Sequence, residues 1–286
     1  MAPTPPTYDY DISVLIGYYR EALQKITNEL NRIDLTNFDR AQLLITQKEI
    51  AEALADLDIR TKSWVASMIP KAVEDGVIYS IIALGVAETV EEAQKIMVLS
   101  RLNRDFIKTA VADTQDDLLQ VSQNIERKVR TAIRQVTAEA MRSNLTQGIN
   151  TTDSIKRDIL KNLRERLGDS INTGIIDAAG RRWKPETYVE MVTQTKLSQA
   201  QRESTINDAL GRNAYYGIIS SHGARDLCRN WEGKVVKLTP DAPGSMPYYG
   251  SLPNREIFHP RCRHVISPVR RLDRLPEDIR SNNGIQ

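Results

Sequence analysis

The sequence has few of the residues that mark several common classes of protein. It contains only two cysteines in 286 residues, too few for the disulfide framework of a small secreted protein. Its most apolar stretch, residues 77–87, is about half as long as the roughly 20 residues that a membrane-spanning helix needs. The first residues lack the basic start and apolar core of a signal peptide. We therefore expect neither a membrane span nor export by a signal peptide.

A strong excess of charge of one sign is also missing. The chain has 39 Lys and Arg against 37 Asp and Glu, a net charge of +2, so it is no polycation built to coat nucleic acid. The balance nevertheless changes along the chain. Residues 211–286 carry 12 Lys and Arg against 7 Asp and Glu, whereas residues 1–210 are slightly acidic. Any contact with nucleic acid is therefore expected to be regional.

Apolar residues recur at helical spacing through most of residues 8–167. The first stripe has members three and four residues apart, which places them on one face of a helix. Its members are Ile12, Leu15, Ile16, Tyr19, Leu23, Ile26, Leu30 and Ile33. A second run begins near residue 39, and we expect Pro70 to kink or stop its helix. These stripes predict long amphipathic helices packed against one another.

Glycine and proline are absent between Gly85 and Gly148. This stretch predicts one or two long helices, which could together approach about 60–90 Å. Thr89, followed by Glu92 three residues later, predicts a capping box at a helix start. We expect an elongated helical region over residues 1–150.

Residues 151–213 change in character and are predicted to be a helical linker region. A short helix should begin at residues 151–153 and end at Gly168, followed by a β-hairpin near residues 171–183 with Gly180 in its turn. Pro185 should begin another helix, and Gly211 should end it.

Residues 214–286 predict a small irregular domain that contains β-structure. Its strand candidates are residues 215–220, 234–238 and 265–269, separated by connections rich in Gly and Pro. The predicted fold class is therefore mainly α, with long helices in a bundle or an extended hairpin. A small C-terminal α+β domain, stapled by zinc, completes it.

All histidines and cysteines of the chain lie within 43 residues of this last region. Thiolate and imidazole groups suit zinc, which is usually held by four of them. We predict Cys228, His259, Cys262 and His264 as ligands, with His222 as a substitute for one of them. The alternative is that they are two buried thiols and three ordinary histidines.

The residues around this cluster resemble a known family. The first motif runs from His222 through Cys228 and Trp231 to Val235, and the second is His-Pro-Arg-Cys-Arg-His at residues 259–264. Together they resemble the C-terminal signature of the minor capsid, or head-morphogenesis, proteins of tailed bacteriophages. The resemblance covers roughly residues 175–268. Some relatives have cysteine at the positions of Trp231 and His264.

The resemblance implies a structural virion component that is present in few copies inside the head, near the portal. It would act in head morphogenesis or in genome packaging and delivery, after assembly in the host cytoplasm. The implied partners are the portal protein, the major capsid or scaffold proteins, and packaged DNA. In this interpretation the chain is not an enzyme.

Six arginines are candidates for contact with phosphates of packaged DNA. They are Arg225, Arg229, Arg261, Arg263, Arg270 and Arg271. The alternative function is a zinc-supported nucleic-acid-binding protein or nuclease, in which His259 or His264 would be the general base beside Asn254 or Asp226. Against an enzyme, the sequence lacks deaminase, H-E-x-x-H, Walker A and G-x-S-x-G motifs.

Overall fold

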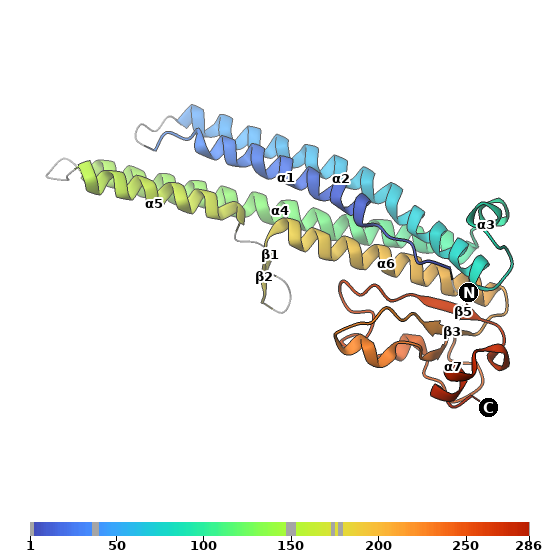
Figure 1. Cartoon of the computed structure of the whole chain (residues 1–286). Coiled ribbons are helices and arrows are strands. Elements are labelled where there is room, and N and C mark those ends of the chain that lie inside the picture. Colours follow the sequence, from blue (N-terminus) through green and yellow to red (C-terminus); the bar gives the residue numbers. More distant parts are fainter. Residues whose placement is uncertain (1–2, 36–39, 147–152, 173–174, 177–179, 286) are drawn as a thin grey trace. The chain divides into compact units, whose positions relative to one another are not determined.

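A computed structural model of the whole chain describes residues 3–35, 40–146, 153–172, 175–176 and 180–285 (Figure 1). It confirms a mainly α fold with a small C-terminal region of short strands. The helices are α1 (Asp9–Asn31), α2 (Arg40–Ala83), α3 (Val90–Ile96), α4 (Arg101–Thr146), α5 (Asp153–Asn172), α6 (Pro185–Gly211) and α7 (Glu277–Asn282). The strands are β1 (Ile175–Ile176), β2 (Arg182–Trp183), β3 (Tyr216–Ile219), β4 (Val235–Lys237) and β5 (Ile266–Val269). Three 3-10 turns are η1 (Leu227–Trp231), η2 (Tyr249–Ser251) and η3 (Leu272–Arg274).

The chain forms two compact units. The helical unit comprises residues 11–64 and 115–190, and the mixed unit comprises residues 1–10, 65–114 and 191–286. Each of α2, α4 and α6 contributes residues to both units, so the units are assembled from separate stretches of chain. The boundaries that we predict at residues 150 and 213 instead divide the sequence into consecutive regions by composition.

The core of the helical unit is made by the predicted apolar stripes. Helix α1 buries Leu15, Tyr19 and Ile26 completely, as its periodicity predicts. The Tyr19 hydroxyl donates a hydrogen bond to the Leu118 carbonyl of α4 at 3.3 Å, which gives this buried polar group a partner. Arg164 of α5 donates to the carbonyl at the end of α1. Segments of α1, α2, α4 and α5 therefore pack as a bundle.

Long helices are confirmed, whereas the predicted helix end at Gly168 is wrong and, of the kink or stop predicted at Pro70, the stop does not occur. The 46 residues of α4 correspond to about 69 Å. Helix α2 continues through Pro70, although proline removes a backbone hydrogen bond. Ile69 and Val73, on either side of Pro70, are buried, and this packing outweighs the local preference. Similarly, α5 continues beyond Gly168 because Leu167 and Ile171 are both buried.

The other predicted helix boundaries agree with the structure. Thr89 is the N-cap of α3, and its hydroxyl accepts a hydrogen bond from the Glu92 backbone N–H at 3.2 Å. Pro185 begins α6, and Gly211 ends it. Among the described residues, no helix is both long enough and apolar enough to cross a membrane.

In the mixed unit, α6 packs closely against α2 and α4. The Thr205 hydroxyl donates to the Gly76 carbonyl at 2.9 Å, and the Asn207 amide donates to the Asn103 side chain at 2.8 Å. A Cβ atom at Gly76 would lie 2.0 Å from Ser204 Oγ and 2.2 Å from the Gln201 carbonyl oxygen. Because the carbonyl oxygen belongs to the backbone of α6 and cannot rotate away, α2 and α6 can approach this closely only where α2 has glycine.

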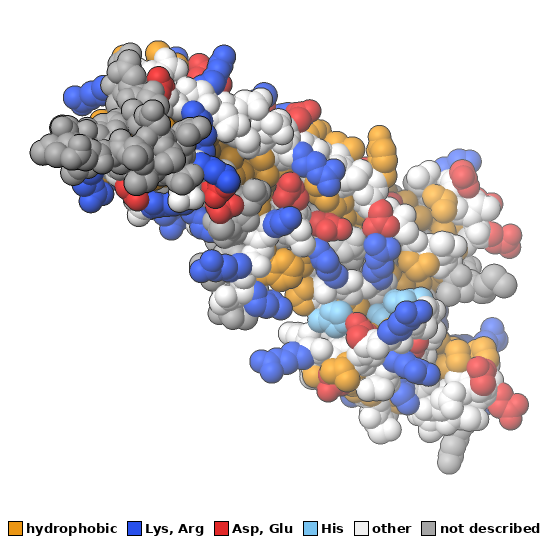
Figure 2. All heavy atoms as spheres, turned by 60° about the vertical axis from the view of Figure 1, so that its left-hand side comes forward, with side chains coloured by type: hydrophobic (Ala, Val, Ile, Leu, Met, Phe, Trp, Pro, Cys, Tyr) orange, Lys and Arg blue, Asp and Glu red, His pale blue; other side chains and the backbone are white. Residues whose placement is uncertain are grey.

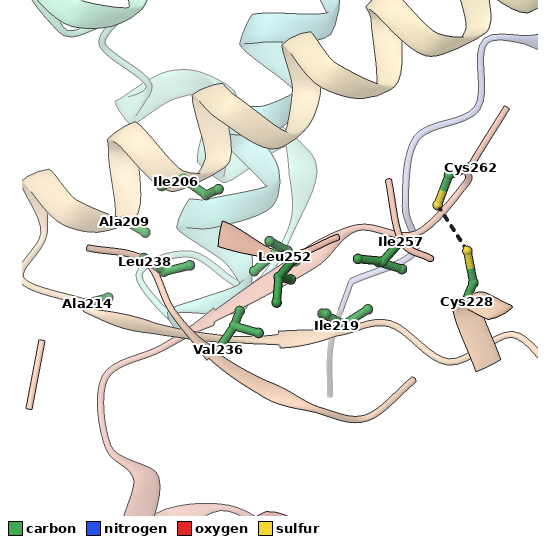
Figure 3. Close-up of a cluster of buried hydrophobic side chains, with 11 residues drawn as sticks. Ile206, Ala209, Ala214, Ile219, Cys228, Val236, Leu238, Leu252, Ile257 and Cys262 are labelled. Carbon is green, nitrogen blue, oxygen red and sulfur yellow. Dashed lines mark hydrogen bonds between the residues drawn. The ribbon is translucent and has the colours of Figure 1, made fainter. Parts of the chain in front are cut away.

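Both sets of strands form where the sequence predicts them. Strands β4, β3 and β5 make an antiparallel sheet in that order, with Ile218 opposite Val235 on one side and Ser267 on the other. Strand β1 pairs with β2 as a hairpin, and Gly180 has a φ of +77°. Residues 177–179 of the predicted turn lie outside the described residues. The three-stranded sheet supports the core that contains the two cysteines (Figure 3).

Replacement of Gly76 by alanine should destabilise the protein by about 3 kcal/mol, because the new methyl group would force α2 and α6 apart. Denaturant unfolding of the full chain measures this change. Gly17→Ala is the matched control. That position in α1 has no atom within 4 Å of the added Cβ, so helix propensity should stabilise the variant by roughly 1 kcal/mol. Equal effects of the two substitutions would contradict the close helix contact.

Candidate metal centre

The two thiols face each other within the core of the mixed unit. Cys228 lies in η1 and Cys262 lies in the connection before β5, and both side chains are buried (Figure 3). Their sulfur atoms are 3.7 Å apart, so the cysteines are free and not joined as a disulfide. Two thiolates bound at about 2.3 Å to one tetrahedral zinc ion would be about 3.8 Å apart. The spacing of the sulfurs therefore fits a shared metal ion.

His264 presents one ring nitrogen to the thiols. Its Nδ1 lies 3.3 Å from Cys262 Sγ, while its Nε2 lies 3.3 Å from Glu232 Oε1. An ionised carboxylate only accepts hydrogen bonds, so the proton of the neutral imidazole belongs on Nε2. The lone pair of Nδ1 is then directed to the sulfur side. A carboxylate that orients a histidine in this way is typical of metal centres.

His259 is oriented by its own loop. Its Nδ1 donates to the Pro260 carbonyl at 2.9 Å, which leaves the lone pair on Nε2. That nitrogen lies 3.0 Å from Cys228 Sγ and 3.2 Å from Asp226 Oδ2. A lone pair and a carboxylate oxygen at this distance repel each other unless a proton or a metal cation lies between them. The site is therefore suited to a cation.

Donor atoms of the cluster fall into three overlapping groups, each with its atoms within 4.8 Å of one another. The first is Cys228, Cys262 and His264, the second is Asp226, Cys228 and His259, and the third is His222, Glu232 and His264. Cys228 belongs to the first two groups, so it links His259 to the other predicted ligands. These groups could hold a metal ion.

The substitute ligand, His222, lies at the edge of the cluster. It is exposed, and its ring centroid is 4.0 Å from that of His264. Its backbone N–H donates to Glu232 Oε1 at 2.8 Å. Histidine side chains also reach the surface in Figure 2, beside side chains of Lys and Arg. His222 therefore shares Glu232 with His264 and does not join the group with two cysteines.

Helix α6 supports the loop that carries His259 and Cys262. The Thr195 hydroxyl accepts a hydrogen bond from the Arg261 backbone N–H at 3.3 Å, and the Arg202 guanidinium lies 4.2 Å from the Phe258 ring centroid. Phe258 and Arg261 have φ angles of 57° and 67°, a region that side chains other than glycine rarely adopt. This conformation is maintained because the surrounding contacts stabilise it, as is common at functional sites.

The protonation of the cluster follows from its surroundings. Burial raises the pKa of the Cys228 thiol, and burial also lowers the pKa of His264. The backbone N–H groups of Ala224 and His222 lower the pKa of Glu232 to about 2. The metal-free cluster thus has a neutral thiol and a neutral imidazole beside a charged carboxylate. A bound divalent cation would favour the thiolate form, because its charge compensates for burial.

The six arginines proposed for DNA contact do not form one patch. Arg225 and Arg261 line a pocket of about 210 Å³ at the cluster, whereas Arg270 and Arg271 line a separate, larger groove. Arg263 lines both, and its guanidinium forms a two-point ion pair with Asp9 at 2.9 and 3.2 Å. Arg229 lines neither hollow and is exposed.

Two carboxylates that organise the cluster, Asp226 and Glu232, are not among the metal ligands predicted from the sequence. Asp226 is the N-cap of η1, where its Oδ1 accepts from the Cys228 backbone N–H at 3.0 Å. Glu232 accepts hydrogen bonds from two backbone N–H groups and from His264. The sequence feature that could have indicated them is that Asp226 and Glu232 lie on either side of Cys228. Histidine ligands generally need such partners.

Glu232→Ala should destabilise the mixed unit by about 2 kcal/mol, because three donors lose their acceptor. Glu232→Gln keeps one acceptor oxygen and should lose less than half as much. Chemical denaturation of both variants measures the difference. Asp241→Ala, at an exposed carboxylate, is the control and should be nearly neutral. A similar loss in the control would contradict the organising role of Glu232.

The whole chain was compared with known proteins. Neither the curated proteins nor the solved structures yielded a match to the chain. A family profile, however, matches residues 40–282, which include all of α2, all of α4 and every residue of the cluster. The description of that family is phage minor capsid protein 2. The match covers most of the chain, so this protein belongs to the phage minor capsid protein 2 family.

Proposed function

We propose that the chain is a structural minor capsid protein located inside the head of a tailed phage, near the portal. There it acts in head morphogenesis or in genome packaging and delivery. The family match over residues 40–282 supports this proposal. Membership implies association with other virion proteins, and we propose the portal protein and the major capsid or scaffold proteins as partners. A few copies in each head suffice for this role.

We propose further that the cluster binds one structural zinc ion. Cys228, His259, Cys262 and His264 are the ligands, as the sequence predicts. The sulfur spacing of 3.7 Å supports this assignment, as does the pair of imidazole nitrogens that lie within 3.3 Å of the thiols. Two thiolates and two imidazoles form a donor set that suits zinc, whereas magnesium and calcium prefer oxygen ligands.

The zinc ion would act as a staple between separate parts of the small domain. Cys228 belongs to η1, whereas the other three ligands precede β5. The three-stranded sheet of this domain has strands of only three or four residues. Because such a small sheet buries little apolar area, a metal cross-link would contribute a large share of the stability of the domain.

A structural role for the metal agrees with a function other than catalysis. Four protein ligands fill a tetrahedral zinc site, whereas a catalytic zinc keeps one position open for water or substrate. The three arginines around the cluster, Arg225, Arg261 and Arg263, would then contact DNA through phosphates without reading its sequence. Packaged DNA therefore remains a proposed partner.

The zinc proposal predicts about one zinc ion per chain in purified full-length protein, measured by elemental analysis. Cys262→Ser should remove most of the zinc and lower the unfolding temperature by on the order of 10 °C. A chelator should have the same effect on the unsubstituted protein, because both changes leave the staple open. His222→Ala is the matched control and should retain the zinc, since that ring lies at the edge of the cluster.

A small domain that is folded in purified protein containing no zinc would contradict the proposed structural role of zinc. So would a Cys262→Ser variant with the zinc content and unfolding temperature of the unsubstituted protein. Cutting of plasmid DNA by the zinc-loaded protein, absent from the Cys262→Ser variant, would instead support the nuclease alternative.

The proposed location predicts that the chain is recovered with purified, DNA-filled heads of the phage that encodes it. It should resist added protease until the heads are opened, because the shell excludes the enzyme. Quantitative mass spectrometry should give far fewer copies of it than of the major capsid protein, which is the internal reference. Digestion in intact heads, or recovery only in the soluble lysate, would contradict an interior position.

A further inference from the structure

A groove of about 990 Å³ lies in the mixed unit, apart from the four predicted metal ligands. One side is formed by Tyr79 of α2 and by Leu84 directly after that helix, and another by residues in the range 270–279. Ile218 of β3 and residues 267–269 of β5 also line it. The Tyr79 hydroxyl and Ser267 Oγ are 2.6 Å apart, so a hydrogen bond joins α2 to the sheet within the groove. Its volume is at the upper end of those of typical ligand pockets.

The charge of this groove has one sign. Its lining includes Arg263, Arg270, Arg271 and Arg274, and among the described lining residues there is no Asp or Glu. Arg263 is paired with Asp9, and Arg271 is paired with Asp273. In the part of the chain that the structure describes, the exposed side chains of Arg270 and Arg274 make no ion pair within 4.0 Å. The charge of Arg274 contributes to lowering the pKa of Asp273, but neither Arg270 nor Arg274 is in ion-pair contact with a described residue, so both guanidinium groups can pair with an anionic ligand.

The groove also offers apolar surface beside these arginines. Leu84, Ile218 and Leu275 are partly buried and line it together with two prolines of the N-terminal segment, Pro3 and Pro5. Contacts with DNA phosphates need cationic and hydrogen-bonding groups and gain little from apolar walls. A peptide that combines carboxylates with apolar side chains would use both parts of the groove.

The edge of the sheet limits how such a peptide can bind. Strand β5 is at the edge of the three-stranded sheet, and Pro268 in it has no N–H to donate. Addition of a further strand along β5 is therefore disfavoured. Side chains, rather than a continued backbone ladder, must hold the ligand.

We propose that this groove binds an extended acidic segment of another protein. Carboxylates of the segment pair with Arg270 and Arg274, and its apolar side chains pack against Leu84, Ile218 and Leu275. The complementary charge supports this occupant, since the lining has arginines and no carboxylate among the described residues. None of the four proposed zinc ligands lines the groove, whereas His222 and Arg263 line both the groove and the pocket at the cluster.

The test uses the full chain and a fluorescein-labelled peptide of about eight residues in which Glu and Leu alternate, with fluorescence anisotropy as the readout. The peptide should bind, and added salt should weaken binding. The double variant Arg270→Glu/Arg274→Glu should weaken it by about tenfold or more. Ile218→Thr keeps a β-branched side chain in β3 and should weaken it by about threefold.

Arg255→Glu is the matched control, because Arg255 is exposed in the same unit and outside the groove. Its affinity should stay within about twofold of the unsubstituted chain. A labelled oligothymidylate of similar length tests nucleic acid as the occupant. The proposal is overturned if the peptide does not bind, or if Arg255→Glu weakens peptide binding as much as the double variant does. It is also overturned if the double variant loses binding of the oligothymidylate but keeps binding of the peptide.

Discussion

The contact between two buried thiols is the constraint on which the small domain depends. Cys228 and Cys262 belong to the same apolar cluster as Ile219 and Val236 of the sheet, so the core and the candidate metal centre are one structure (Figure 3). Thirty-four positions separate the two cysteines in sequence. Closing so long a connection costs chain entropy, which a few strand hydrogen bonds offset only in part. The side chains that meet at the sulfurs therefore determine the path of the chain between β3 and β5.

The carboxylates explain how the cluster can be arranged before any cation binds. Glu232 takes its hydrogen bonds from backbone N–H groups as well as from His264, so it remains in place and charged over the whole physiological pH range. Asp226 fixes the start of η1 and lies beside His259. Preorganised donors lose little entropy when they bind a ligand, which raises affinity without additional contacts. The cluster thus combines a rigid outer set of oxygens with an inner set of sulfur and nitrogen atoms.

The sequence predicts most of the elements and fails where a local signal opposes packing. The stripe from Ile12 to Leu30 is sufficient to place α1, because burial of one face is what forms the helix. Pro70 and Gly168 suggest helix ends, yet both helices continue, because buried residues on either side of each position stabilise the next turn. Single-residue preferences amount to about 1 kcal/mol for glycine and about 3 for proline, which several buried side chains exceed.

The site shows a different limit of prediction. The co-occurrence of every His and Cys in one region is visible in the sequence, and four of these residues meet in space within hydrogen-bonding distance of a neighbour. The grouping of the arginines is not visible, because it depends on which side of the sheet each connection takes. Arg261 and Arg270 are nine positions apart, yet one lines the pocket at the cluster and the other lines the groove.

Strand β5 connects these two places. His264 is two positions before its first residue, and Arg270 directly follows its last. Because β5 pairs with β3 along its whole length, a shift of the loop that contains Cys262 would either break this register or move Arg270 with it. A sheet with one buried face resists a change of register, since a slip by one residue would turn Ile266 away from the core. The register of β5 therefore couples the position of the loop that contains Cys262 to that of Arg270 in the groove.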